Sequence, residues 1–96
     1  MNNTDTIALL RSHKPTLTRE FGVRKLALFG STVRNEADAD SDVDILVDFA
    51  GPAISSRYFG LQFYLEDMLD RPVDLVTDKA LRSELRQYVE SEAVYV

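Results

Sequence analysis

The chain has no cysteine and a single histidine, His13, among its 96 residues. The absence of cysteine excludes disulfide bonds, zinc sites built from thiolates and a thiol nucleophile. With one imidazole available, any metal site has to draw on oxygen ligands. Oxygen ligands that leave room for retained water favour Mg²⁺ or Mn²⁺ over zinc.

Long hydrophobic runs are also missing. No stretch approaches the 18 or so apolar residues of a membrane span, and the polar first residues show no basic segment followed by an apolar one. These absences predict a cytoplasmic protein that does not associate with membranes. The length and the 45% hydrophobic and 28% charged residues are typical of one folded domain, residues 1–96, without repeats or a linker.

Basic residues are scarce where acidic residues gather. The formal net charge is -5, and six of the 16 acids lie at 36–48, a stretch without Lys or Arg. Outside it, the other ten acids nearly balance the 11 basic residues. Proteins grip long nucleic acid mainly through Lys and Arg, so this composition argues against direct binding of long nucleic acid. A concentrated group of carboxylates suits divalent cations instead.

Hydrophobic periodicity predicts an α/β domain with a small mixed sheet. Apolar or alternating runs predict strands at 23–29, 43–49 and 73–76, and helical spacing predicts helices at 57–69 and 80–92. Lys14-Pro15 predicts a break between two short N-terminal helices, because the residue before proline avoids the helical region. We expect helices to cover one face of the sheet and carboxylates to occupy the other.

Three acids are candidates for metal ligands. Asp42 and Asp44 are two residues apart on a predicted strand, so their side chains point to the same side with Cα atoms about 6.5 to 7 Å apart. Asp74 lies in another short apolar strand, where a lone carboxylate needs a partner. If the two strands are neighbours, the three carboxylates converge. Asp48 lies about 13 Å from Asp44 along an ideal strand, so we expect it to be exposed and outside the site.

A candidate phosphate-binding turn precedes these acids. Gly30-Ser31 follows an apolar strand and opens a predicted short helix, so its backbone amides and the Ser31 hydroxyl can form an anion cradle. Arg34, one helical turn further on, adds a positive charge. A phosphate cradle next to a carboxylate metal site is the equipment of phosphoryl or nucleotidyl transfer.

The joint pattern resembles the polymerase-beta-type nucleotidyltransferase superfamily, whose motif is Gly-Ser followed after about ten residues by Asp-x-Asp. More closely, nearly the whole chain is similar to the minimal nucleotidyltransferase (MNT) family, the antitoxin half of HEPN/MNT toxin-antitoxin pairs. The matching segments are Phe21-Gly22-Val23, Leu28-Phe29-Gly30-Ser31, Ser41-Asp42-Val43-Asp44, Val73-Asp74-Leu75-Val76 and Glu92-Ala93-Val94-Tyr95-Val96. Asp70 stands where the family commonly has glycine, and Asp tolerates the left-handed conformation of such a turn.

The resemblance implies a function and a role for each candidate residue. It implies transfer of AMP from ATP to a tyrosine of the cognate HEPN ribonuclease toxin, which silences the toxin. Asp42 and Asp44 would bind two Mg²⁺ ions, and Asp74 would complete the site for the ion that activates the attacking hydroxyl. Gly30 and Ser31 would hold the terminal phosphates of the nucleotide, with help from Arg34.

Two other functions stay open at this point. The chain could be a non-catalytic antitoxin that acts by binding alone, although binding does not need a repulsive group of three carboxylates. It could also be a nucleotidyltransferase that acts on a small molecule such as an aminoglycoside, for which a chain of this length would have to build a pocket by dimerising.

The predicted helix at 57–69 carries two apolar stripes. The broad stripe is expected to face the core, and the narrow one consists of Phe59 and Phe63, one turn apart. One sheet cannot easily bury both stripes. Either a preceding loop covers the two phenylalanines or a partner protein does.

Overall fold

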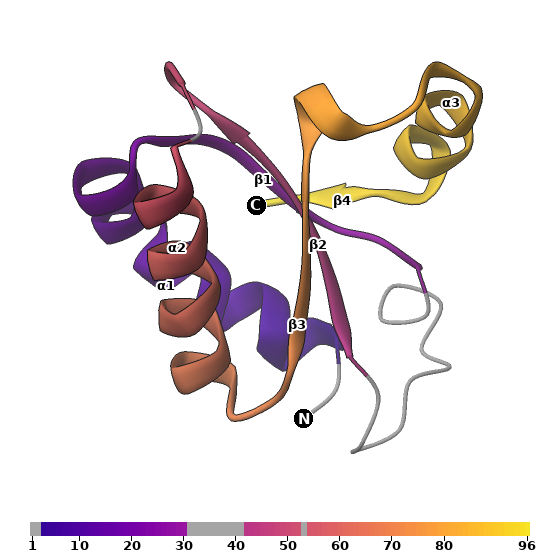
Figure 1. The fold of residues 1–96 in the computed structure, drawn as a ribbon. Helices are drawn as coiled ribbons and strands as arrows, with labels where there is room; N and C mark the ends of the chain where they lie inside the picture. The colour runs from indigo at the N-terminus through magenta and orange to yellow at the C-terminus, as the bar shows by residue number, and fades with distance from the viewer. Residues whose placement is uncertain (1–2, 31–41, 53) are drawn as a thin grey trace.

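The computed structural model describes residues 3–30, 42–52 and 54–96. Within these residues, three α-helices and a four-stranded sheet form an α/β arrangement (Figure 1), which confirms the predicted fold class. In chain order the elements are α1 (Asn3–Phe21), β1 (Val23–Leu28), β2 (Val43–Phe49), α2 (Ser55–Leu69), β3 (Val73–Thr77), the 3-10 turn η2 (Asp78–Ala80), α3 (Ser83–Glu92) and β4 (Val94–Tyr95).

The sheet is mixed, with the strand order β3-β2-β1-β4. β1 is antiparallel to both β2 and β4, whereas β2 and β3 are parallel. The parallel pair needs a crossover connection, and α2 provides it. The two predicted carboxylate-bearing strands are therefore direct neighbours.

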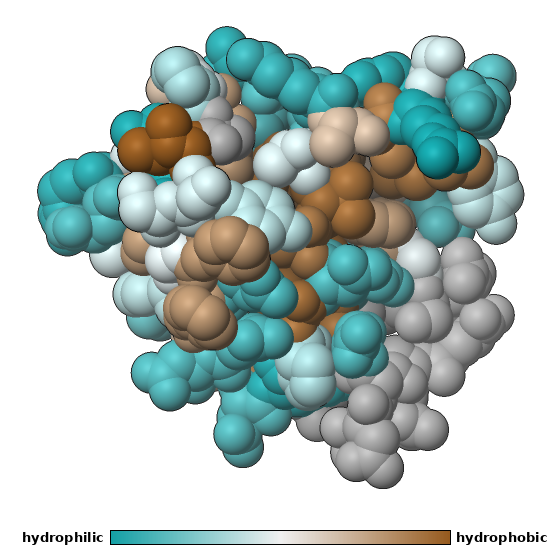
Figure 2. Space-filling model, viewed as in Figure 1, coloured by the Kyte–Doolittle hydropathy of each residue, from teal (hydrophilic) through white to brown (hydrophobic). Residues whose placement is uncertain are grey.

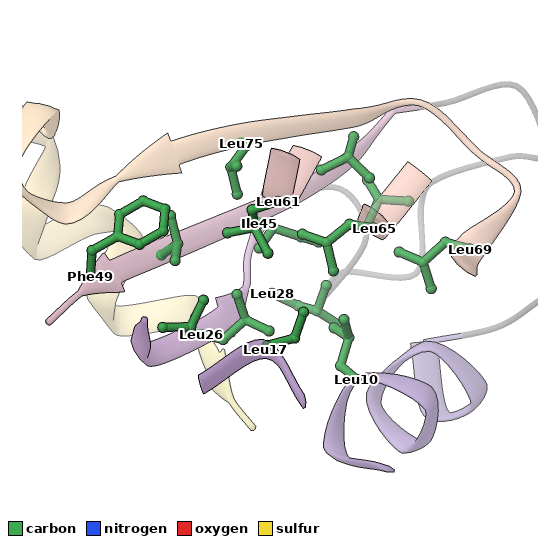
Figure 3. Close-up of a cluster of buried hydrophobic side chains, with 14 residues drawn as sticks. Leu10, Leu17, Leu26, Leu28, Ile45, Phe49, Leu61, Leu65, Leu69 and Leu75 are labelled. Carbon is green, nitrogen blue, oxygen red and sulfur yellow. The ribbon is translucent and has the colours of Figure 1, made fainter. Parts of the chain in front are cut away.

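Side-chain alternation on β2 separates the two faces of the sheet. Ile45, Val47 and Phe49 are buried in the main core, where they meet leucines from α1 and α2 on the same face (Figure 3). The other face carries Asp44, Leu46 and Asp48, as expected for a period of two. We call this second face, together with Asp74 of β3, the carboxylate face.

Helix α1 differs from the prediction of two short helices. It runs without interruption from Asn3 to Phe21, with Pro15 inside it. Leu10 and Leu17, two turns apart on opposite sides of the proline in sequence, are both fully buried in the core. Pro15 itself is exposed, so its ring faces solvent and the loss of one backbone hydrogen bond is offset by the packing of the whole helix.

Helix α3 packs on the carboxylate face and covers part of it. Val89 forms a small second core with Ala27 of β1 and Leu46 of β2. The helix begins at Ser83, three residues later than predicted. Of the residues predicted to begin it, Ala80 belongs to η2 instead, and its amide donates a hydrogen bond to the Thr77 hydroxyl. Among the described residues, no helix is long and apolar enough to cross a membrane.

Helix α2 covers the outer edge of β3. Tyr58 donates a hydrogen bond to the Leu75 carbonyl, and Gln62 donates to the Val73 carbonyl at 3.1 Å. Glu66 accepts a hydrogen bond from the Val73 amide at 2.9 Å. These three side chains, spaced four residues apart, satisfy backbone groups that an edge strand would otherwise expose. The contacts fix β3, and with it Asp74, relative to the rest of the sheet.

Candidate active site

Asp44 and Asp74 are direct neighbours on the carboxylate face. They pair in register across the parallel β2–β3 ladder, so their side chains leave the same face of the sheet. Adjacent strands are about 4.8 Å apart, which brings the two carboxylates within reach of a shared cation. Asp74 is exposed and Asp44 is half-buried. The pairing of β2 with β3, the condition on which the predicted convergence depended, thus brings two of the three acids together.

Asp42 comes directly before β2, two residues ahead of Asp44, and is exposed. The first ladder hydrogen bond, from the Val43 amide to the Pro72 carbonyl at 2.9 Å, fixes the chain next to it. Within 3–30, 42–52 and 54–96, no three His, Cys, Asp or Glu side chains are grouped tightly enough to hold one ion as they stand. The oxygen-only donor set of these three acids fits Mg²⁺ chemically, and side-chain rotation would be needed to bring all three carboxylates onto it.

Gly30 lies against the carboxylate of Asp44. Its φ of +69° is in the left-handed region, and a Cβ atom added there would lie 3.1 Å from the Asp44 Cγ and closer still to Oδ2. Glycine is the residue that accepts both constraints, because it has no side chain and populates positive φ readily. The turn after β1 therefore brings the backbone into direct contact with a candidate metal ligand. Ser31 and Arg34, the other two predicted cradle residues, lie outside the described residues.

A glutamate that the sequence pointed to only as part of a family-matching segment, and not as a site residue, contacts this turn. The Gly30 amide donates a hydrogen bond to Oε1 of Glu92, the last residue of α3, at 3.1 Å. The two residues are 62 positions apart in the chain, so no local pattern could connect them. Only the pairing of β4 with β1 brings the end of α3 to the end of β1.

Asp48 is not solvated as predicted. Its side chain is 11% exposed and accepts hydrogen bonds from the guanidinium of Arg24 on the neighbouring strand β1, at 2.9 Å from Nε and 2.6 Å from Nη2. The prediction was wrong because strand spacing reveals nothing about cross-strand partners. The ion pair nevertheless agrees with a place outside the metal site, since Asp48 is occupied with a structural contact.

Tyr58 lies close enough to Asp74 for the two side chains to interact electrostatically. Burial, and then the negative charge of Asp74, raise the pKa of the Tyr58 phenol. The hydroxyl therefore stays protonated and continues to donate to the Leu75 carbonyl. Like Glu92, Tyr58 was not among the predicted site residues. Its hydrogen bond helps to hold the strand that bears Asp74.

A small cavity of about 160 Å³ lies on the carboxylate face, with Leu46 on one wall. Its other walls are mostly charged, and Arg86 on α3 is paired with Asp78 at 2.8 Å and with Glu90 at 3.5 Å. The lining holds two basic and three acidic side chains, so the cavity presents no net positive charge to a phosphate.

Comparison with known proteins shows the family of the chain. The nucleotidyltransferase domain family matches residues 10–96. The chain is 46% identical over 89 residues to the protein adenylyltransferase MntA of Thermococcus cleftensis, and the match covers 93% of this chain and 90% of the relative.

Solved structures show the same fold. A structure described as a minimal nucleotidyltransferase superposes with a TM-score of 0.83 at 33% identity, covering 98% of this chain and 95% of that one. A toxin-antitoxin structure with AMP-PNP gives 0.70 at 28% identity, with 99% and 72% covered. The complex of a tri-AMPylated Shewanella oneidensis HEPN toxin with an MNT antitoxin gives 0.60 at 28% identity, with 98% and 67% covered.

The match of the family over nearly the whole chain and the identity to MntA lead to one assignment. The chain belongs to the nucleotidyltransferase domain family and is a nucleotidyltransferase of its minimal, protein-adenylyltransferase branch, the branch that supplies antitoxins to toxin-antitoxin pairs.

Proposed function

We propose that this chain is an antitoxin that transfers AMP from ATP to a tyrosine hydroxyl of a HEPN-domain toxin. The observation that carries the proposal is the in-register pairing of Asp44 with Asp74 on one open face, beside the glycine turn at Gly30. The AMP-PNP bound in one related structure and the AMPylated toxin in another support the nucleotide and the acceptor.

The carboxylates give the site its chemistry. Asp42, Asp44 and Asp74 would hold two Mg²⁺ ions, which would neutralise charge on the phosphates and lower the pKa of the attacking hydroxyl. The proximity of Asp44 to Asp74 is unfavourable without a cation, because like charges this close repel by about 1 kcal/mol or more, depending on screening. A protein that only binds its partner has no need for this arrangement.

The turn after β1 would hold the triphosphate. Gly30 allows the backbone to approach Asp44 closely, so phosphates bound at Gly30 and Ser31 would lie next to the carboxylates. Arg34 would add a cation to the cradle. The tyrosine oxygen of the toxin would then form a bond to the α-phosphorus while the bond to the β-phosphate oxygen breaks, releasing pyrophosphate, and the phenolic proton passes to solvent.

An exposed apolar patch on α2 provides a docking surface for the toxin. Phe59 is 51% exposed and Phe63 is 65% exposed, so the chain does not bury this stripe in its own core. Figure 2 shows apolar side chains over α2, surrounded by hydrophilic ones. Beside them an open groove is lined by Phe21, Gly60 and Phe63, among others. Of the two explanations left open by the sequence, the exposure favours a partner protein.

The experiment is an adenylylation assay with the cognate toxin. The purified chain is incubated with the toxin, ATP and Mg²⁺, and intact mass spectrometry of the toxin is combined with tryptic mapping of the modified residue. We expect addition of AMP to tyrosine, and no addition with EDTA or with Asp44→Asn. Silencing of the toxin without any mass change would point to an antitoxin that acts by binding alone. Modification of a small-molecule acceptor, with an unmodified toxin, would point to the third candidate.

A further inference from the structure

We propose that Glu92 is a positioning residue for the nucleotide site: its carboxylate holds the Gly30 amide and thereby fixes the glycine turn against Asp44. The inference rests on the proposed function, because it assigns Glu92 a part in shaping the turn at which the triphosphate is proposed to bind. The Gly30 amide itself donates to Glu92 and is not counted among the phosphate donors. Glu92 itself is not placed in contact with the reacting atoms.

The contact is built by the C-terminal part of the chain. Glu92 accepts the Gly30 amide hydrogen at 3.1 Å. Directly after Glu92 the chain enters β4, where Val94 pairs with Leu28 and Tyr95 with Ala27. Continued by two residues, this antiparallel register places position 92 opposite position 30. The Glu92 side chain therefore makes its hydrogen bond where the backbone ladder between β1 and β4 has already ended.

Gly30 needs such a restraint. The regular hydrogen bonding of β1 with β2 reaches Phe29, whose amide donates to the Asp44 carbonyl at 3.1 Å. Gly30 follows immediately with a φ of +69°, and glycine has the greatest backbone freedom of any residue. The hydrogen bond from the Gly30 amide to the charged Glu92 carboxylate limits that freedom. It keeps the Gly30 Cα against the Asp44 carboxylate, where an approaching phosphate would find the turn already formed.

The position of Glu92 on its helix points the same way. A negative charge in the last turn of a helix is unfavourable with respect to the helix dipole, and the last turn of α3 contains no basic residue to compensate. Val89, one turn earlier, anchors the helix on Ala27 and Leu46. The hydrogen bond from the Gly30 amide gives this carboxylate a favourable interaction at the end of α3.

The test compares three variants of the full chain. Glu92→Ala removes the acceptor, Glu92→Gln keeps an acceptor oxygen without the charge, and Glu90→Ala removes a neighbouring carboxylate of the same turn that faces Arg86 instead. Calorimetric titration with ATP and Mg²⁺ should show binding about tenfold weaker for Glu92→Ala. Glu92→Gln should stay within about threefold of the wild type and Glu90→Ala should match it. In the transfer assay, Glu92→Ala should raise the KM for ATP more than it lowers kcat.

A second measurement does not depend on nucleotide. In the ¹⁵N-labelled apo protein, hydrogen exchange of the Gly30 amide should be faster in Glu92→Ala than in the wild type, and Glu92→Gln should restore most of the protection. If Glu92→Ala fails to fold, the same comparison is made with Glu92→Asp, whose shorter side chain should lose the contact and weaken ATP binding.

Four results would overturn the inference: unchanged ATP binding in the folded Ala or Asp variant, tighter ATP binding in either, an equal loss in Glu92→Gln and Glu92→Ala, or unchanged Gly30 exchange. Tighter binding would mean that Glu92 competes with the phosphates. Failure of the wild-type chain to bind ATP would instead contradict the proposed function.

Discussion

The Cα of Gly30 lies so close to the Asp44 carboxylate that a Cβ atom added to it would be 3.1 Å from the Asp44 Cγ. The glycine is thus required twice, once by its positive φ and once by the acid across from it. The same contact places the turn that is proposed to bind phosphate next to a proposed metal ligand. A side chain at position 30 would have to push the carboxylate out of place.

This relationship predicts that Gly30→Ala abolishes ATP binding. A non-glycine residue at positive φ costs about 1 kcal/mol or more, and the added methyl group would also displace Asp44. The control is Gly51→Ala: Gly51 also has a positive φ, of +109°, but an added Cβ would meet nothing within 4 Å. Urea unfolding should show a loss of about 1 kcal/mol or more for both variants, whereas ATP titration should separate them. Equal ATP affinity in the two variants would place the cradle elsewhere.

Replacing Asp74 by Asn should abolish AMP transfer and leave the apo protein at least as stable as the wild type. The reason is that the change removes one of two neighbouring carboxylates that repel each other in the absence of a cation. Transfer is measured by mass spectrometry of the toxin, and stability by thermal melting in EDTA.

The matched control for Asp74→Asn is Asp48→Asn on the same face. It breaks the pair with Arg24 and should cost up to about 1 kcal/mol of stability while transfer continues. Retained transfer in Asp74→Asn, or its loss in Asp48→Asn, would contradict the assignment of the site.

Tyr58→Phe should destabilise the fold by about 1 kcal/mol, because it removes the hydrogen bond to the Leu75 carbonyl at the edge of β3. The pKa of the Tyr58 phenol is raised above its ordinary 10.0, so its protonated form is favoured by folding. Its contribution to stability is therefore fully present below about pH 10 and is lost as the pH rises through the higher folded value.

Denaturant titrations between pH 7 and pH 11 should thus show a smaller alkaline loss of stability for Tyr58→Phe than for the wild type. Tyr88→Phe, at a tyrosine that is 64% exposed, is the control and should follow the wild-type curve. Parallel curves for all three proteins would show that Tyr58 does not titrate differently in the folded state.

The double change Phe59→Ala with Phe63→Ala should weaken the complex with the toxin by about 2 kcal/mol or more, as is typical for aromatic residues at the centre of an interface. Because both rings are already more than half exposed, the monomer should melt at nearly the wild-type temperature and bind ATP normally. The control replaces Leu85 and Tyr88, an exposed apolar pair on α3, in the same way.

Toxin affinity is measured by surface plasmon resonance, and modification by mass spectrometry at limiting concentrations. If replacing Leu85 and Tyr88 weakened the complex and replacing the two phenylalanines did not, the docking surface would lie on α3. Loss of folding in the α2 double variant would show that the two phenylalanines contribute to the protein's own core.

Short-range sequence patterns predicted much of the fold. The alternation at 43–49 matched β2 residue for residue, because the period of a half-buried strand is a local property. Asp70 adopts a φ of 55° at the end of α2, as its place in a predicted left-handed turn required. The Pro15 prediction failed for the opposite reason: the local preference of Lys14-Pro15 was outweighed by the burial of Leu10 and Leu17 in a core that local sequence cannot show.

The sequence alone determined the chemistry available to this protein: acids at 42, 44 and 74, a glycine before a serine at position 30, no thiol and one imidazole. Residue types and short spacings are enough for that conclusion, since they set which ligands and charges exist. The tertiary structure decided which of them meet. The register of β2 with β3 makes Asp44 and Asp74 neighbours. On the adjacent pair of strands, Asp48 forms its ion pair with Arg24. The pairing of β4 with β1 brings Glu92 next to Gly30. These contacts depend on how distant segments pair, and pairing is settled by the packing of the whole core.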